Sequence, residues 1–162
     1  MANNPPPDLV LAPIEGDAHT VAEWLTMFHL LLVAVDPFSE RSAWLVDTAG
    51  RVLKQYDQSD CRVAWLVGGS PDEARLFLGP WAQSIMTFAD PDLVATKALG
   101  LTTLPAIVLL ALDGSVEGAV EGWDPEQWRE LTDRLSELVS WSRPVIPTAG
   151  DPAPFEGAPV GA

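Results

Sequence analysis

Short apolar runs alternate along this chain with longer segments in which apolar residues recur every three or four positions. Short runs of this kind suit strands that are covered on both faces of a parallel sheet. We expect strands at residues 30–35, 62–67, 84–89 and 106–112, and a further short strand near residues 9–12. We expect helices at residues 17–28, 39–56, 70–79, 90–100 and 124–143. Strands and helices in alternation predict a layered α/β domain.

Residues at the expected helix starts support these boundaries. Residues 70–73 read Ser-Pro-Asp-Glu, with a serine N-cap, proline at the first position and glutamate three residues after the cap. Residues 124–127, Asp-Pro-Glu-Gln, repeat this arrangement before the clearest amphipathic helix. Asp17 is expected to cap the first helix, and residues 90–92, Asp-Pro-Asp, to cap the fourth.

The segment 39–56 admits two interpretations. Leu45, Ala49 and Val52 share one face of a helix that Ser39 would cap. Gly50 lies inside it, where glycine costs roughly 1 kcal/mol relative to alanine, and a hairpin is the alternative. We favour the helix, because two parallel strands need a crossover and no other segment is available for one.

An Asp113-Gly114 turn follows the strand at 106–112 and predicts a hairpin with residues 116–121. This hairpin would make the sheet mixed. Many of the 15 prolines gather near the two ends of the chain of 162 residues. We therefore expect an N-terminal arm at residues 1–16, one folded domain at 17–143, and a disordered Pro/Gly/Ala-rich tail at 144–162.

Acidic residues outnumber basic ones by 23 to 9, which gives a formal charge of −14. Nucleic acids and anionic lipid surfaces attract proteins through clustered Lys and Arg, so neither is an expected partner. The first twenty residues show no basic stretch followed by an apolar run. No secretory signal is therefore predicted, and the expected location is the cytoplasm.

The chain has one cysteine, Cys61, and two histidines, His19 and His29. One cysteine excludes an intramolecular disulfide, and these residues give no evident ligand set for zinc. No Gly-rich phosphate-binding loop is present in the sequence. We therefore expect neither a metal nor a cofactor.

The stretch from residue 100 to residue 128 carries a familiar combination of motifs. It reads Gly-Leu-Thr-Thr-Leu-Pro-Ala at 100–106, then an apolar strand, an Asp-Gly turn, a second strand, and Gly-Trp-Asp-Pro-Glu-Gln-Trp at 122–128. This resembles the C-terminal half of thioredoxin-fold proteins. The strand and helix at 62–79 are similar to the redoxin group, which includes TlpA-like reductases and peroxiredoxins. The implied fold is thioredoxin-like, an α/β domain with a central mixed sheet flanked by helices and a C-terminal β-hairpin and helix.

The resemblance implies that Pro105 is cis and that its loop faces the family's Cys-x-x-Cys motif. At that place residues 36–44 read Asp-Pro-Phe-Ser-Glu-Arg-Ser-Ala-Trp, with Ser39 and Ser42 at the spacing of the two cysteines. A helix N-terminus lowers the pKa of a thiol there, but a serine hydroxyl remains neutral. Disulfide exchange through this motif is therefore excluded by composition.

The implied function is a non-catalytic protein-binding module, as an adaptor, chaperone or assembly factor. In this fold the groove between motif and cis-proline loop takes an extended peptide of another protein, a form of strand addition. Here the expected groove residues are Pro37, Phe38, Ser39, Ser42, Leu104, Pro105 and Trp123. A weaker similarity links the chain to cysteine-less thioredoxin-like chaperones of nickel-iron hydrogenase maturation, from which its extra strand and helix depart.

Three alternatives stay open. The first is a thiol oxidoreductase or peroxidase that acts through Cys61, although a small apolar filler of the core is the favoured interpretation of that residue. The second is a scaffold whose Pro-rich tail docks onto a partner. The third is acid–base chemistry by Asp36, Glu40 and Arg41, which we interpret instead as solvated residues at a helix start.

Overall fold

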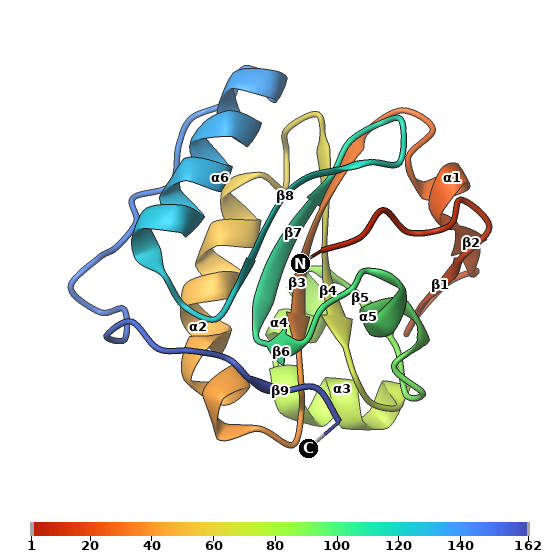
Figure 1. The fold of residues 1–162 in the computed structure, drawn as a ribbon, viewed down its shortest axis with the longest axis horizontal. Coiled ribbons are helices and arrows are strands. Elements are labelled where there is room, and N and C mark those ends of the chain that lie inside the picture. Colours follow the sequence, from red (N-terminus) through yellow and green to blue (C-terminus); the bar gives the residue numbers. More distant parts are fainter. Residues whose placement is uncertain (1, 162) are drawn as a thin grey trace.

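The computed structural model of the chain describes residues 2–161. Its centre is a seven-stranded sheet in the order β2-β1-β5-β4-β3-β7-β8 (Figure 1). The strands are β1 (Val10–Pro13), β2 (His19–Thr20), β3 (His29–Val35), β4 (Cys61–Val67), β5 (Met86–Ala89), β7 (Ala106–Leu110) and β8 (Val116–Glu121). The helices are α1 (Val21–Trp24), α2 (Glu40–Gln55), α3 (Pro71–Leu78), α4 (Trp81–Ser84), α5 (Val94–Ala98) and α6 (Pro125–Val139).

The sheet is mixed, as the sequence predicts. β3 pairs parallel with β4, and β4 pairs parallel with β5. β7 runs antiparallel to β3 and to β8, which forms the expected hairpin, and β1 runs antiparallel to β5. The central strand β3 is covered by neighbours on both sides, and its residues from Leu30 to Val35 are fully buried.

Alternate residues of the central strands point into two separate apolar layers. On one face, residues such as Leu31 and Trp65 pack against α2, α3 and α6. On the other face, residues such as Leu32 and Leu66 pack against α1 and α5. Figure 1 shows α2 and α6 side by side on one flank of the sheet and α1 and α5 on the other. This is the alternation that a doubly covered sheet requires.

Two helix starts agree with the sequence in their atomic detail. The Ser70 side chain accepts a hydrogen bond from the Glu73 N–H, and the Glu73 carboxylate accepts one from the Ser70 N–H. At α6, Asp124 accepts a bond from the Gln127 N–H. The prediction of a helix over residues 39–56 is also confirmed, in preference to the hairpin.

Gly50 inside α2 has a packing reason. A Cβ atom at this position would lie 2.5 Å from Cε2 of Trp81, closer than van der Waals contact allows. The absence of a side chain lets the indole ring of Trp81 pack directly on the helix backbone. The glycine that weakens the helix prediction is therefore required by a contact from α4.

Other expected boundaries are wrong. The helix predicted at 17–28 is a single turn, α1, and its cap is Thr20 rather than Asp17. The preceding residues pair with β1 as β2, which sequence periodicity could not reveal. The helix expected from residue 90 begins at Val94, although the buried Asp90 carboxylate still accepts bonds from the N–H groups of Ala95 and Thr96.

The C-terminal segment, residues 144–161, differs most from expectation, because disorder was predicted there. It descends beside α6 and α2 and then crosses to the loop before β7 (Figure 1). There β9 (Ala158–Pro159) pairs antiparallel with β6 (Thr103–Leu104). Composition alone suggested disorder, but specific contacts to the domain hold this segment in one path.

Asp151 is the main anchor on that path. Its carboxylate lies 2.8 Å from the Arg51 guanidinium and accepts hydrogen bonds from the Thr48 hydroxyl and the Thr148 N–H. Arg51 and Thr48 both belong to α2. Upstream, Ile146 is buried in the core cluster that α2 and α6 share. In the described part of the chain, none of the helices is long and apolar enough to span a bilayer.

Candidate functional site

The loop between β3 and α2 is the place where the sequence predicts the family's redox motif. The buried Ser42 hydroxyl accepts a hydrogen bond from the Asp36 N–H at 3.0 Å, and the Asp36 carboxylate accepts one from the Phe38 N–H at 2.9 Å. Ser39 is the N-cap of α2, and its side chain makes no capping hydrogen bond. These bonds give Asp36 and Ser42 a structural role in the loop. Neither residue has a thiol, so they support no thiol chemistry.

The cis-proline loop also forms, since the Leu104–Pro105 peptide bond is cis as predicted. Just before it, β6 is held by the Glu121 carboxylate of β8. One oxygen of Glu121 accepts bonds from the N–H and hydroxyl groups of both Thr102 and Thr103, at 2.7 to 3.1 Å. Burial raises the pKa of Glu121, but these four bonds outweigh burial and lower it below 4.5. An ionised glutamate thus fixes the orientation of β6.

The C-terminal segment lies on this edge. Besides the β6–β9 pairing, the Val160 N–H donates to the Thr102 carbonyl at 2.9 Å. Earlier in the segment, Phe155 and Trp123 form an isolated antiparallel bridge, with hydrogen bonds of 2.8 and 3.1 Å in the two directions. The segment is therefore extended and bonded through its backbone, which is the geometry of an added strand.

Side chains complete the enclosure of the segment. The Arg41 guanidinium, from the first turn of α2, donates to the carbonyl oxygens of Glu156 and Gly157, both at 3.1 Å. The Trp44 ring meets the Phe155 ring edge to face, with centroids 5.5 Å apart. The Trp123 indole N–H donates to the Pro152 carbonyl at 2.8 Å. We call the surface that contacts the segment the β6 groove; it is formed by Arg41, Trp44, Thr103, Leu104, Gly122 and Trp123.

The structure places the predicted site residues in two groups. Leu104 and Trp123 contact the C-terminal segment through their backbones, and the Pro105 carbonyl accepts a bond from the Gly122 N–H beside them. Ser42 is buried beneath the loop, and Pro37 and Ser39 are half-buried. Phe38 is 71% exposed and makes no hydrogen bond or ring contact to the segment.

Sequence reasoning missed several residues of the groove. The sequence predicts a solvated Arg41 and does not reveal its bonds to the segment, because the carbonyl groups that Arg41 binds lie about 115 residues away in the chain. Thr103 and Glu121 gave no signal, since their pairing depends on the fold. The closest available clue to the groove was the Pro-rich composition of residues 144–159, which suits an extended strand as well as disorder.

The single thiol lies far from this groove. Cys61 starts β4 opposite His29, whereas the motif loop follows Val35 at the other end of the paired strands. With about 3.3 Å per residue, that separation is about 20 Å along the sheet. Cys61 is buried, and burial raises the pKa of its thiol to about 12.

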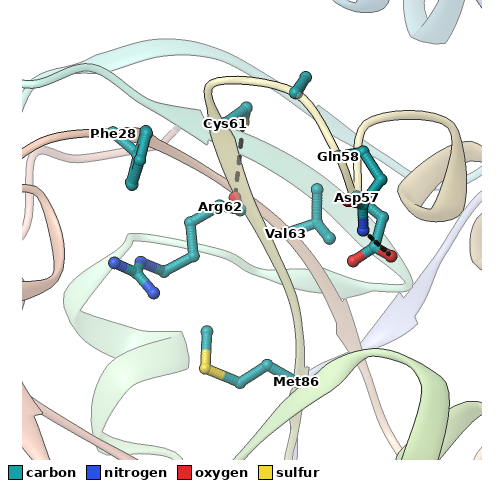
Figure 2. Close-up of a pocket in the computed structure, with 8 residues that line it drawn as sticks. Phe28, Asp57, Gln58, Cys61, Arg62, Val63 and Met86 are labelled. Atoms are coloured by element: carbon teal, nitrogen blue, oxygen red, sulfur yellow. Dashed lines mark hydrogen bonds between the residues drawn. The ribbon is translucent and has the colours of Figure 1, made fainter.

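A pocket of about 440 Å³ opens beside Cys61. Figure 2 shows Arg62 reaching across it, with its guanidinium directed away from the thiol. The guanidinium lies 5.2 Å from the ring centre of Trp24 and 5.8 Å from that of Phe28, which are cation–π distances. The thiol donates a hydrogen bond to the Arg62 carbonyl. The Asp57 carboxylate also lines the pocket, but it is bonded to Lys54 and Gln58. Within residues 2–161, no group of three or more His, Cys, Asp and Glu side chains is placed to hold a metal ion.

Comparisons with known proteins give a structural likeness without a sequence family. No model of a known protein family matches the chain, and no match was found among curated proteins. DsbF of Mycobacterium tuberculosis, solved in mixed oxidised and reduced forms, superposes with a TM-score of 0.66 at 18% identity, over 82% of this chain and 96% of that one. Peroxiredoxin Q of Xanthomonas campestris gives 0.62 at 14% identity, over 82% and 90%. A hypothetical protein of Sinorhizobium meliloti gives 0.70 at 12% identity, over 99% and 93%.

These likenesses establish the fold. The chain has a thioredoxin-like, redoxin-type architecture, and with one cysteine in the sequence it cannot carry the Cys-x-x-Cys motif. The predicted fold class is thereby confirmed. At these identities the likeness shows the fold alone.

Proposed function

We propose that this chain is a non-catalytic protein-binding module that holds an extended segment of a partner as an added strand in the β6 groove. One observation carries the proposal: the edge of β6 pairs antiparallel with an extended segment in this structure, through backbone bonds that do not depend on side-chain identity. Such bonds give affinity for many sequences, while pockets for side chains give selectivity.

The geometry of the groove supports binding of a backbone rather than a reaction. Arg41 directs its guanidinium at two successive carbonyl oxygens, and Glu121 fixes Thr102 and Thr103, at the start of β6, so that the edge is preorganised. Preorganisation reduces the entropy lost on binding. At the position of the motif, the serine hydroxyls have pKa values far above neutrality, so the helix N-terminus has no thiolate to stabilise.

The alternative is thiol chemistry through Cys61, and the names of two compared structures favour it. One is a peroxiredoxin, and another was solved in oxidised and reduced forms. Against it stands the ionisation of the thiol: with a pKa of about 12, on the order of one thiol in 10⁵ is a thiolate at pH 7. The thiolate is the reactive species, so this environment opposes redox catalysis.

A selection followed by mapping tests the proposal. A displayed library of random twelve-residue peptides is selected on the full chain, and bound peptides are mapped by amide chemical shifts in ¹⁵N spectra. We expect the shifts to concentrate at Thr103, Leu104 and Trp123. Shifts confined to Cys61, Arg62 and Phe28 would instead identify the pocket at the opposite end and overturn the proposal.

The redox alternative is tested in parallel. Insulin reduction and hydroperoxide consumption are measured for the full chain and for Cys61→Ser. We expect neither activity above background in either protein. Turnover that disappears in Cys61→Ser would establish the thiol as a nucleophile and refute the non-catalytic assignment.

A further inference from the structure

We propose that the β6 groove is selective for an extended segment with a glycine packed against Thr103 of β6 and an aromatic residue two positions before that glycine. Residues 155–160 of the chain's own C-terminal segment are the resident occupant. A partner protein with the same pattern binds by displacing them. This inference rests on the proposed function and adds to it the chemistry of the ligand and the state of the unliganded chain.

The requirement for glycine follows from how closely the segment packs against the Thr103 side chain and the Leu104 carbonyl. A Cβ atom at Gly157 would lie 2.8 Å from Oγ1 of Thr103, 2.9 Å from Cβ of Thr103 and 3.0 Å from the Leu104 carbonyl oxygen. Thr103 cannot move aside easily, because its N–H and hydroxyl are both bonded to Glu121. Any larger residue at this position must therefore shift the segment away from β6.

A second glycine, Gly122 of the groove, lies against the segment next to Gly157. A Cβ atom at Gly122 would lie 2.8 Å from the Phe155 carbonyl oxygen and 2.9 Å from the Gly157 nitrogen. Gly122 also has φ of +79°, a conformation that favours glycine in its own right. Both sides of the contact therefore lack side chains where the segment crosses the end of β8.

The aromatic preference comes from Trp44. This residue is 55% exposed even with the segment bound, and its ring meets the Phe155 ring edge to face at an interplanar angle of 89°. Aromatic pairs in this arrangement contribute about 0.5–1.5 kcal/mol beyond their burial. The N–H and the carbonyl group of Phe155 are both hydrogen-bonded to the Trp123 backbone. These two bonds fix the position of Phe155 along the groove, and so the position of its ring.

The groove is also tolerant of proline, which suits the composition of the segment. Pro159 lies opposite Thr103, and the bond from the Val160 N–H to the Thr102 carbonyl makes 103–159 a pair without mutual hydrogen bonds. A missing N–H at this position loses no bond of the ladder. The pattern recognised is thus an aromatic residue, any residue and a glycine, with proline tolerated two positions after the glycine, as in Phe155–Pro159.

The resident segment is tethered, so a partner must compete with it. Asp151 is bonded to α2 through Arg51 and Thr48, which holds the following residues near the groove at a high effective concentration. The apparent affinity for a partner is then reduced by the fraction of chains whose groove is empty.

Two substitutions in the full chain separate occupancy from folding. Gly157→Ala introduces the close contact with Thr103, whereas Gly150→Ala is a matched control in the same segment, with no atom within 4 Å of the new Cβ. The probe is a fluorescein-labelled peptide of residues 151–161, and binding is followed by anisotropy. We expect Gly157→Ala to bind this peptide at least tenfold more tightly than the unchanged chain and Gly150→Ala do.

Variants of the peptide, measured on the Gly157→Ala protein, test the selectivity of the groove. A peptide with alanine in place of Gly157, or of Phe155, is expected to bind at least tenfold more weakly than the unchanged peptide. Equal binding by all three chains would show that the groove is not occupied in the unliganded protein, and equal binding of the peptide variants would refute the selectivity.

If no form binds the tail peptide while library-selected peptides bind at β6, this inference fails and the proposed function stands. If neither kind of peptide binds, the proposed function fails as well.

Discussion

At the scale of single residues, the chemistry open to this chain depends on its one thiol. Cys61 is 3% exposed, and burial raises its pKa to about 12. We predict that iodoacetamide at pH 8 labels the native chain at least about 100-fold more slowly than the urea-unfolded chain, because reactivity follows the thiolate fraction and exposure. Mass spectrometry of timed samples measures both rates. Labelling of the native chain at the unfolded rate would contradict the burial described here.

Glu121 is the residue that most directly holds β6 and the preceding residue in place. Its carboxylate accepts four bonds from Thr102 and Thr103. We predict that Glu121→Ala lowers the free energy of unfolding by about 1–3 kcal/mol, since hydrogen bonds to a charged group are lost together. Urea denaturation measures it. Glu117→Ala, on the same strand, is the control and should change stability by less than about 0.5 kcal/mol; equal effects would remove the special role of Glu121.

At the scale of elements, α2 and α4 are fitted to each other around Gly50. At an interior helix position, alanine normally raises the stability of the helix by about 1 kcal/mol relative to glycine. Here the new Cβ would meet the Trp81 ring at 2.5 Å, so we predict that Gly50→Ala destabilises the chain by about 1–3 kcal/mol instead.

A double-mutant cycle isolates that contact. In a Trp81→Ala background the same glycine substitution should be neutral or stabilising, as in an ordinary helix. Thermal or urea unfolding of the four proteins gives the coupling. A substitution that is equally destabilising with and without Trp81 would show that the ring is not the cause.

The C-terminal segment carries a pH dependence through Asp151. Burial raises the pKa of Asp151, but bonds from Thr148, Thr48 and Arg51 outweigh it and lower the pKa below its ordinary 3.8. Because the pKa is lowered in the folded chain, the ionised Asp151 contributes its full stabilisation at pH values above 3.8. This stabilisation is lost as the pH falls below 3.8 and through the lower pKa of the folded chain. Glu121, whose pKa is also lowered, acts in the same direction at β6.

We therefore predict that acid releases the C-terminal segment before the sheet unfolds. In Asp151→Asn the segment should open about tenfold more often at neutral pH, with a weaker acid dependence, because a charged bond is lost. The Trp123 indole N–H, which is bonded to the Pro152 carbonyl, reports this opening in proton spectra. An indole signal that changes only together with the whole sheet would contradict it.

The same elements show what the sequence could and could not predict. Local signals sufficed at α3 and α6, where the cap, the proline and the acidic or amide residue lie within four positions of one another. They failed at residues 17–28, because pairing of β2 with β1 overrides the helical period. They failed at the C-terminal segment for a related reason: its partners on α2 and β6 are distant in sequence, and composition cannot register them.

At the scale of the whole molecule, the two ends of the parallel strands carry different sets of candidate residues. The motif loop, the cis-proline loop and the C-terminal segment meet at one end, and Cys61 with its pocket lies at the other. The fold and the position of the degenerate motif were predictable, because apolar runs, caps and the Gly100–Pro105 stretch are local. The occupant of the groove was not, since it depends on Arg41, Thr103 and Gly157 meeting in space.

Amide hydrogen exchange of the full, unchanged chain tests this account most directly. Without added peptide, the Val160 and Phe155 amides should exchange slowly, because they are bonded to Thr102 and Trp123. Addition of a library-selected peptide should make both amides exchange rapidly while those of β3 and β4 stay protected. Rapid exchange from the start, or protection that a bound peptide leaves unchanged, would contradict a groove that its own segment fills and a partner takes over.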